Sequence, residues 1–213
     1  MEYTGFKKEC HSGKIHIYNG DCMDLLRQTP DKYYSLSIVD PPYGLGDKLT
    51  QGGTWASKYK KSDSCWDILP TQEYFEHLFR VSKNQIIWGG NYFNLPPTRC
   101  FLIWDKVALM NTMADCEFAW TSFDRNAKIF RHARNTNEKR IHITQKPVTL
   151  YKWILQNYAK EGDTILDTHF GSLSIGIACH DLGFELTAVE LNEDYYEAGK
   201  KRLIEHQKQL KIF

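Results

Sequence analysis

The sequence is poor in several features that would assign it to a protein class at once. Its 213 residues include six cysteines, and no two of them form the C-x-x-C pair typical of zinc sites. No apolar run approaches the ~18 residues that a membrane span needs. The opening residues MEYTGFKKECHSGK also lack the apolar stretch of a signal peptide. We therefore expect a cytoplasmic protein with free thiols, without a bound metal and without a membrane partner.

An excess of charge of one sign is also missing. The chain has 27 Lys and Arg residues against 26 Asp and Glu residues, a formal net charge of +1, whereas nucleic-acid-binding domains are often strongly basic. The distribution is nevertheless uneven, because residues 124–146 carry seven basic and two acidic side chains, a local net charge of +5. Attraction to phosphate acts locally under physiological screening, so a nucleic-acid partner stays open.

The remaining composition is that of a folded domain. Charged residues make up 25% and apolar residues 42% of the chain, which excludes disorder of the whole chain. We expect one domain over residues 1–213, with a mobile loop at 44–64 and a small insertion at about 107–140.

Short β-rich runs alternate with helical stretches, which favours an α/β fold with a largely parallel sheet. We expect strands at 14–19, 35–39, 85–88, 101–104, 164–166 and 186–189, and a hairpin that pairs 117–123 with 127–132. We expect helices at 23–28, 71–82, 147–159 and 172–182, and a last one from 193 nearly to the end.

The first candidate site is Asp40-Pro41-Pro42-Tyr43, which directly follows an expected strand. Open α/β sheets bind ligands at the carboxyl ends of their strands. The Asp40 carboxylate and the Pro41 carbonyl could accept hydrogen bonds from one amino group, and Tyr43 offers a ring face for a flat heterocycle. A nucleobase flipped out of a duplex needs that combination.

The second candidate site is the segment Asp167–Ser174, DTHFGSLS, between an expected strand and a helix. Gly171 permits close approach of the backbone, and the helix N-terminus presents unpaired N–H groups. Glu190 ends the next strand about twenty residues on, where it could accept hydrogen bonds from ribose hydroxyls. Alone this is a weak nucleotide-binding signal, because Leu173 stands where G-x-G-x-x-G has its second glycine.

With both motifs in this order, the chain resembles the amino-group DNA methyltransferases that use S-adenosylmethionine. It is similar to the permuted (β-type) class, in which a DPPY motif precedes the cofactor motif, and to phage or prophage members that carry a bulky residue at the position of Leu173. The resemblance covers nearly the whole chain. The matching segments are Gly20-Asp21, Asp40–Tyr43, Thr144-Gln145-Lys146-Pro147, Asp167–Gly171 and Glu190.

The resemblance implies a Rossmann-like sheet of seven strands, mostly parallel, with an antiparallel hairpin and a circularly permuted methyltransferase order. The strand ending at Asp40 would then lie beside the strand ending at Asp167, although the two are distant in sequence. It also implies a bacterial or phage-infected cell as the location.

The resemblance assigns roles to individual residues. Asp40, Pro41, Pro42 and Tyr43 would be catalytic. S-adenosylmethionine would be bound by Asp21, Asp40, Lys146, Asp167, His169, Phe170, Gly171, Ser172 and Glu190.

The resemblance implies methylation of the N6 amine of a flipped adenine in double-stranded DNA. Adenine is favoured because the first residue of the DPPY motif is Asp rather than Ser. Cytosine N4 or an RNA acceptor stays open, as does a nucleic-acid-binding relative in which Leu173 blocks the cofactor. The chain contains no Pro-Cys pair, the nucleophile motif of the carbon-5 cytosine enzymes.

Two segments are candidates for binding DNA. The target-recognition insertion and its flank carry Arg125, Lys128, Arg131, Arg134 and Arg140, and the loop at 44–64 carries Lys58, Lys60 and Lys61. Because the insertion is small, a second copy of the chain in a homodimer could assist recognition. A cognate restriction endonuclease is a further partner that the resemblance leaves open.

Overall fold

The protein is described by a computed structural model that covers residues 2–11, 13–44, 67–107, 114–133, 141 and 145–209. The strands are β1 (Lys7–His11), β2 (Ile15–Asn19), β3 (Tyr34–Val39), β4 (Ser82–Trp88), β5 (Phe101–Asp105), β6 (Cys116–Thr121), β7 (Lys128–Arg131), β8 (Thr164–Asp167) and β9 (Glu185–Glu190). The helices are α1 (Cys22–Gln28), α2 (Gln72–Val81), α3 (Val148–Tyr158), α4 (Ser174–Leu182) and α5 (Glu193–Gln207), with a 3-10 turn η3 (Gly90–Tyr92).

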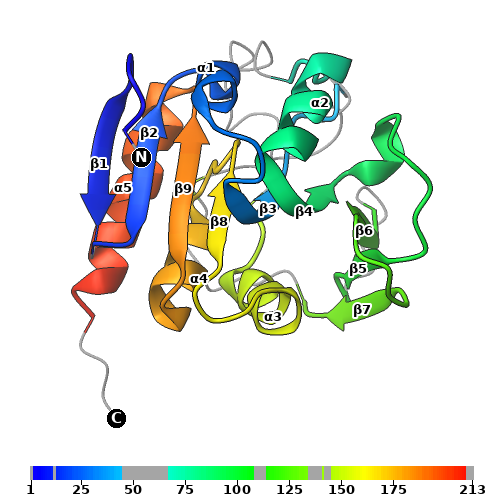
Figure 1. Ribbon diagram of the computed structural model, residues 1–213. Helices are drawn as coiled ribbons and strands as arrows, with labels where there is room; N and C mark the ends of the chain where they lie inside the picture. The colour runs from blue at the N-terminus through cyan, green and yellow to red at the C-terminus, as the bar shows by residue number, and fades with distance from the viewer. Residues whose placement is uncertain are drawn as a thin grey trace.

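The strands form one mixed sheet in the order β1-β2-β9-β8-β3-β4-β6-β5-β7 (Figure 1). From β2 to β4 all neighbours are parallel, whereas β1 and β6 run antiparallel to theirs. The expected count of seven strands is wrong, because the described residues alone contain nine. The unexpected strand β1 is a short, charged edge strand, KKECH, whose sequence has no regular apolar alternation.

The expected hairpin between 117–123 and 127–132 is also wrong. Strand β6 lies between β4 and β5, and β7 pairs in parallel with the far side of β5. The antiparallel hairpin of this region is therefore β5–β6. The strands β6 and β7 are neighbours in sequence but not in the sheet, because β5 occupies the place between them.

Two apolar layers sandwich the sheet. One face carries alternate side chains such as Ile17, Ile38 and Ile165 and packs against α3, α4 and α5. The other face carries Val39 and Leu166, among others, and packs against α1 and α2. This alternation follows from the period of two along each strand. Helices thus cover both faces of the sheet (Figure 1).

The expected meeting of the two motif strands is confirmed. Strands β3 and β8 are parallel neighbours, with Leu36 opposite Ile165 and Ser37 opposite Leu166. Because both strands run the same way, Asp40 and Asp167 reach the same edge of the sheet. The order of strands in the sheet reverses direction in sequence at this pair, which is where open α/β sheets bind ligands.

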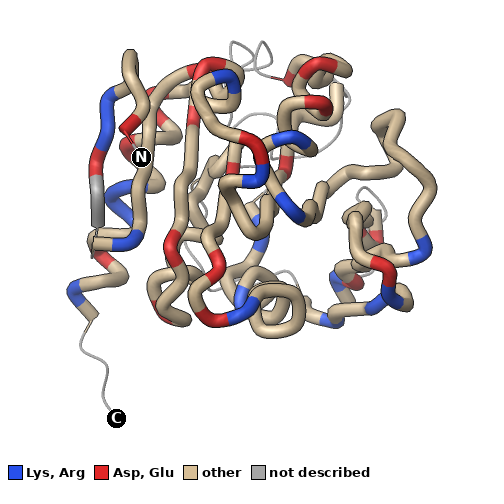
Figure 2. Tube along the Cα trace, in the orientation of Figure 1, with Lys and Arg blue, Asp and Glu red and all other residues tan. Residues whose placement is uncertain are grey.

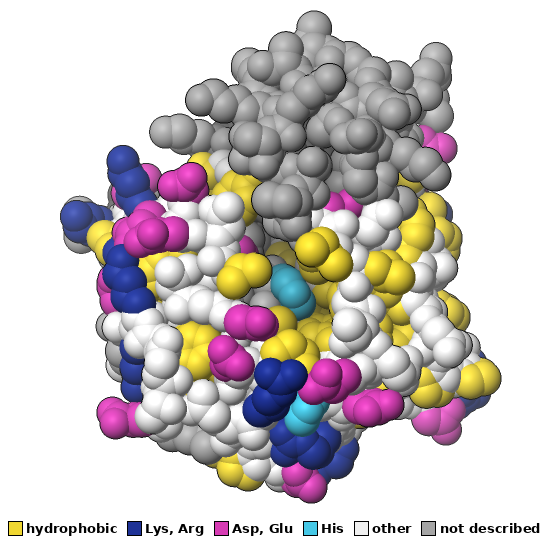
Figure 3. All heavy atoms as spheres, turned by 90° about the horizontal axis from the view of Figure 1, so that it is seen from above, with side chains coloured by type: hydrophobic (Ala, Val, Ile, Leu, Met, Phe, Trp, Pro, Cys, Tyr) yellow, Lys and Arg dark blue, Asp and Glu magenta, His cyan; other side chains and the backbone are white. Residues whose placement is uncertain are grey.

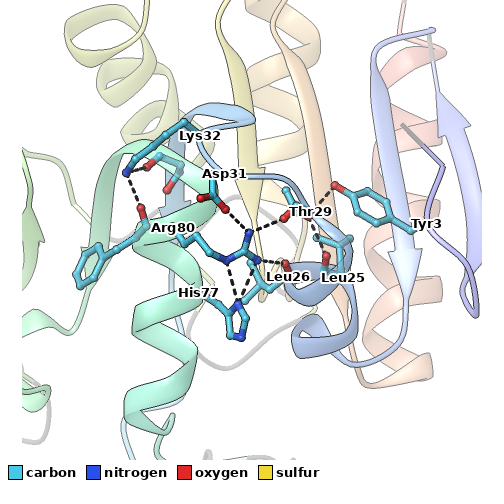
Figure 4. Close-up of polar contacts among 10 residues, drawn as sticks. Tyr3, Leu25, Leu26, Thr29, Asp31, Lys32, His77 and Arg80 are labelled. Atoms are coloured by element: carbon cyan, nitrogen blue, oxygen red, sulfur yellow. Dashed lines mark hydrogen bonds and ion pairs between the residues drawn. The ribbon is translucent and has the colours of Figure 1, made fainter.

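Arg80 on α2 holds the end of α1 on one face of the sheet (Figure 4). The Arg80 guanidinium donates to the carbonyls of Leu26 and Thr29 at 2.7 Å, and to Asp31 Oδ1 at 2.8 Å. The carbonyls at the end of a helix lack partners within it. Arg80, in the last turn of α2, therefore supplies partners at the end of α1 and fixes the two helices together.

In the described part of the chain, no helix is long and apolar enough to cross a membrane. The same residues hold no cluster of three or more His, Cys, Asp or Glu side chains arranged for a metal ion.

Candidate functional site

A cavity of about 610 Å³ opens at the carboxyl ends of β2, β9, β8 and β3. Figure 3 looks down on this edge and shows hydrophobic side chains gathered around a hollow at its centre. The cavity is lined by the turns after these four strands, by the start of α2 and by the start of α3: Gly20–Met23, Asp40–Tyr43, Asp67–Thr71, Tyr74, Gln145, Lys146, Tyr151, Thr168–Ser172, Glu190–Asn192 and Tyr195.

The Asp40 carboxylate is held by two partners. Tyr43 donates its hydroxyl hydrogen to Asp40 Oδ1 at 2.6 Å, and the Lys146 ammonium forms an ion pair with Oδ2. Burial, together with Asp40, raises the pKa of Tyr43, so its phenol stays a hydrogen-bond donor. The side chain of Asp40 is 16% exposed, and a carboxylate has about four acceptor positions. Asp40 can therefore accept further hydrogen bonds from a group in the cavity.

The Tyr43 ring rests on the turn after β4. It stacks on Tyr92 with 5.0 Å between ring centroids and an interplanar angle of 19°. Gly89, at φ +69°, lies so close that a Cβ there would be 2.2 Å from Tyr43 Cε1. The turn therefore fixes the plane of the Tyr43 ring, and only glycine at position 89 allows this contact.

Two further charged residues lie behind the site and were missed by the sequence analysis, Glu117 on β6 and Lys106 just after β5. Glu117 Oε2 is 3.2 Å from Lys146 Nζ, and Glu117 Oε1 is 2.8 Å from Lys106 Nζ. Burial alone would raise the pKa of Glu117, but Lys146 and Lys106 lower it to about 2. The signal in the sequence was a lone Glu in the apolar run CEFAW.

Lys146 is the most enclosed of these groups, with 1% of its side chain exposed. Burial opposes its charge, but Asp40 and Glu117 outweigh burial and raise the pKa of Lys146. Its ammonium also lies 5.1 Å from the centre of the Trp88 ring. Lys146 is thus a buried cation that contacts the Asp40–Tyr43 motif and lines the cavity.

The loop after β8 is fixed by backbone hydrogen bonds. His169 N donates to Asp167 Oδ1 at 3.0 Å, and Phe170 N donates to the Val189 carbonyl at 3.1 Å. Burial, with the charges of Asp40 and Glu190, raises the pKa of Asp167 to about 8 against the hydrogen bond from His169. Asp167 does not itself line the cavity, whereas the loop that it anchors does.

His169 is neutral over the physiological range, because burial lowers its pKa to about 4. Its Nδ1 lies 2.9 Å from Thr168 Oγ1, and its ring meets Tyr74 edge-on. A neutral ring at this place does not repel a cationic ligand in the cavity.

Two carboxylates stand on the β2–β9 side of the cavity. Glu190 accepts from Gly171 N at 2.9 Å and from Asn192 N at 3.0 Å, one bond to each oxygen. Asp21 caps α1 by accepting from Met23 N at 2.8 Å and is exposed. Each keeps free acceptor positions towards the cavity.

Leu173 does not obstruct this site. It adopts a left-handed conformation at φ +55° in front of α4, and its side chain is fully buried. It packs against Gly176 and Gly199, where added Cβ atoms would lie 2.7 Å from Leu173 Cγ and 3.1 Å from Leu173 Cβ. Leu173 is absent from the cavity lining. The expectation that it could block a cofactor therefore loses its physical basis.

The structure does not bring all the candidate DNA-binding residues together. Arg125 donates to the Asn157 carbonyl at 2.9 Å and lies over Tyr158, at the end of α3. Arg125 is thus held at the last turn of α3, whereas the cavity is lined by Lys146 before α3 and by Tyr151 near its start.

Arg131 is placed differently from Arg125. It pairs with Asp105 at the carboxyl end of β5, so it lies on the side of the sheet where the strand ends carry the cavity. Its Nε is 3.2 Å from Asp105 Oδ2. Lys128 is paired with Leu102, three residues further from that edge. Figure 2 shows blue and red segments mixed in this part of the chain. Arg134, Arg140, Lys58, Lys60, Lys61 and Thr144 lie outside the described residues, as does the expected loop from residue 45 on.

A sequence profile of the N6/N4 methyltransferase family, described as DNA methylase, matches residues 55–201. The chain belongs to the N6/N4 DNA methylase family. This methylase is 24% identical over 225 residues to the type II methyltransferase M.HpaI of Haemophilus parainfluenzae, an alignment that covers 84% of this chain and 70% of that protein.

Two solved structures share the fold of the methylase. The M1.HpyAVI–SAM complex superposes with a TM-score of 0.58 at 21% identity, over 89% of this chain and 100% of that one. The PvuII DNA methyltransferase, cytosine-N4-specific, gives a TM-score of 0.63 at 13% identity, over 94% and 88%. At these identities the likeness establishes the fold alone.

Proposed function

We propose that the methylase transfers a methyl group from S-adenosylmethionine to the exocyclic N6 amine of a flipped adenine in double-stranded DNA. The observation that carries this proposal is the position of Asp40, whose carboxylate is fixed by Tyr43 and Lys146 at the wall of the cavity.

The residues around the cavity fit this cofactor. Its volume of about 610 Å³ lies in the usual range for small-molecule sites. Glu190 and Asp21 both line the cavity, where Glu190 would accept hydrogen bonds from the ribose hydroxyls and Asp21 would lie near the adenine. The loop 168–172 with neutral His169 brings no positive charge against the sulfonium. The proposal that S-adenosylmethionine is the cofactor is further supported by the M1.HpyAVI structure, which has the same fold and is a complex with SAM.

When bound, the cofactor would supply a methyl group on a positively charged sulfur, and that sulfur would keep the electron pair of its bond to the methyl group while the amine nitrogen provides the pair for the new bond. Asp40 would accept a hydrogen bond from the target amine and make its nitrogen lone pair more available. The Pro41 carbonyl would accept the second amine hydrogen. The methylated amine would then lose one proton, which the Asp40 carboxylate would accept. Orientation of the reactants can supply about 7–11 kcal/mol of the barrier reduction.

Tyr43 provides the face on which the flipped base stacks. One face of its ring stacks on Tyr92, so the base would lie on the other face. The Asp40–Tyr43 hydrogen bond couples the plane of the ring to the carboxylate that receives the amine.

Cytosine N4 is the second candidate acceptor, because the fold is shared with the cytosine-N4-specific PvuII enzyme. The leading Asp of the motif favours adenine. Double-stranded DNA is the proposed partner. Arg131 is a described basic residue that would meet it, because it ends β7 on the same side of the sheet as the strand ends that carry the cavity, four strands away from β3.

The proposal is tested by incubating the protein with deuterated-methyl S-adenosylmethionine and mixed-sequence DNA, followed by mass spectrometry of the nucleosides. We expect labelled N6-methyladenine. Labelled N4-methylcytosine would instead establish the second candidate, and label only in a parallel RNA sample would overturn both.

The matched variants are Asp40→Asn and Asp24→Asn. We expect Asp40→Asn to reduce methyl transfer at least 100-fold while the Kd for the cofactor stays within threefold. Asp24 is exposed on α1 outside the cavity, so its variant keeps full activity. An active Asp40→Asn protein would rule out the assigned role of Asp40.

A further inference from the structure

Four charged side chains of alternating sign form a connected row, called the charged row below, that ends at the proposed catalytic motif. In order they are Lys106, Glu117, Lys146 and Asp40, and each contacts the next. Its two cations and two anions make the charged row neutral as a whole. It draws on four separate segments of the sequence, the ends of β5 and β3, the start of β6 and the turn before α3.

Lys146 needs the two anionic partners that the charged row provides. With 1% of its side chain exposed, its ammonium has almost no water to solvate it. A single anion, Asp40, would have to balance that charge and also serve the amine of the target base. Glu117 supplies the second anion from the opposite side, and Lys106 in turn neutralises the remaining charge of Glu117.

We propose that Glu117 and Lys106 are positioning residues, which hold Lys146 protonated and in place so that Lys146 fixes the Asp40 carboxylate for the incoming amine. The proposal rests on the proposed function for its kinetic readout only. Neither residue lines the cavity, so neither is expected to touch the cofactor or the base.

The groups that face Lys146 decide how a substitution acts. Among the described residues, the charged or titratable ones near it are Asp40 and Tyr43 after β3, Glu117 on β6, Lys106 after β5, Tyr151 on α3 and Asp167 on β8. Replacing Glu117 by Gln removes one anion and leaves Lys106 and Lys146 facing each other. The pKa of Lys146 must then fall, because the charged form loses its second partner.

The kinetic experiment compares four proteins: the wild type, Glu117→Gln, the double variant Lys106→Met/Glu117→Gln, and Asp181→Asn as control. Asp181 is a part-buried carboxylate that bridges Lys152 and His206 away from the cavity. We expect Glu117→Gln to lower kcat at least tenfold, with the Kd for S-adenosylmethionine within threefold. We expect the double variant to recover at least fivefold over Glu117→Gln, since removing the unpaired Lys106 restores neutrality.

A purely structural role for Glu117 predicts the opposite, because two substitutions in one packed region destabilise more than one. A kcat of Glu117→Gln within twofold of the wild type would overturn the proposal. So would a double variant no faster than the single one.

A titration independent of activity accompanies the kinetics. NMR of the protein with ¹³C-labelled lysine, assigned with Lys146→Met, follows the protonation of Lys146. We expect the resonance of the wild type to stay that of a charged amine to pH 10, and that of Glu117→Gln to titrate at least one pH unit earlier than the wild type. Equal titration in both proteins would overturn the proposal. If the wild type methylates nothing, the proposed function fails, while this titration still decides the role of Glu117.

Discussion

Asp40 is pre-positioned before any substrate arrives. Each of its oxygens has one partner within the protein, Tyr43 or Lys146, and both partners are themselves held, by Tyr92 and Glu117 respectively. A carboxylate fixed in this way would lose little rotational freedom on binding the proposed target amine. At the scale of single residues, the position of Asp40 thus also depends on Tyr92 and Glu117, which do not contact it themselves.

Gly89 allows a direct test of the support beneath Tyr43. Gly89→Ala must strain the backbone at φ +69° and push the Tyr43 ring away. We expect a loss of ~1–2 kcal/mol in the free energy of unfolding from the strained backbone and a fall in kcat of at least tenfold.

The matched control for Gly89→Ala is Gly183→Ala. Gly183 has a similar φ of +78°, but nothing lies within 4 Å of an added Cβ. It should show a similar loss of stability in urea denaturation and an unchanged kcat. Equal activity of the two variants would contradict the role assigned to the turn.

The raised pKa of Asp167 leads us to expect that binding of the cofactor depends on pH. Its pKa of about 8 means that it is largely protonated at neutral pH in the free protein. A cationic ligand favours the ionised form, so binding releases a proton and the affinity rises as the pH rises towards 8. We expect the Kd to tighten by up to about tenfold per pH unit below that point.

Calorimetry between pH 6 and pH 9, in buffers of different ionisation enthalpy, measures this proton release. The ammonium of the cofactor titrates as well, so the comparison with Asp167→Asn isolates the contribution of Asp167. The variant should release fewer protons and show a flatter pH dependence. Identical curves would show that Asp167 is not coupled to binding.

At the scale of elements, the helices on the two faces hold the strand ends in register. Thr71 and Asn192 cap α2 and α5, each accepting from a backbone N–H in the first turn. The expected end of a helix at residue 182 and the expected start of the last helix at residue 193 are confirmed, because capping chemistry is local and is visible in the sequence.

Arg80 is the element-scale feature with the largest expected effect on stability. Its guanidinium makes two hydrogen bonds to carbonyls around the end of α1 as well as the ion pair with Asp31. With 31% of the side chain exposed, we expect Arg80→Met to cost about 2 kcal/mol in the free energy of unfolding.

Arg27→Met serves as the control, because Arg27 bonds only to the exposed side chains of Glu73 and Asp24 among the described residues. Exposed ion pairs contribute about 0–1 kcal/mol, so it should unfold close to the wild type. Urea denaturation of both proteins gives the comparison, and an Arg80→Met protein as stable as Arg27→Met would refute the joining role.

At the scale of the whole molecule, the sheet separates the two arginines that the sequence groups together. Arg131 lies at the edge that carries the cavity, and Arg125 is bound to the far end of α3. We expect Arg131→Gln to weaken DNA binding and to reduce the slope of log K against log salt by about 1, as for one lost phosphate contact.

Arg125→Gln is the matched variant and should leave the slope unchanged, although it loses its contacts with Asn157 and Tyr158. Fluorescence anisotropy with a labelled duplex at several salt concentrations provides the measurement. A larger effect at Arg125 than at Arg131 would place the DNA on the opposite edge of the sheet.

The positions of most helices and strands could be predicted from the sequence, but the pairing of the strands could be predicted only in part. The runs 35–39 and 164–166 read as strands, and β3 and β8 are indeed neighbours. The pairing of 117–123 with 127–132 failed because neighbouring strands in sequence usually pair, and β5 inserts between them here. The short edge strand β1 has no apolar alternation to reveal it.

By itself, the sequence determined the motifs, the helix caps and the class of sheet, because each depends on residues close together in the chain. Only the tertiary structure decided that Leu173 points away from the cavity and that Arg125 and Arg131 lie apart. It alone joined Glu117 and Lys106 to Lys146 and Asp40. The physical reason is that charge balance in a buried site is settled between side chains that meet in space, wherever they stand in the sequence.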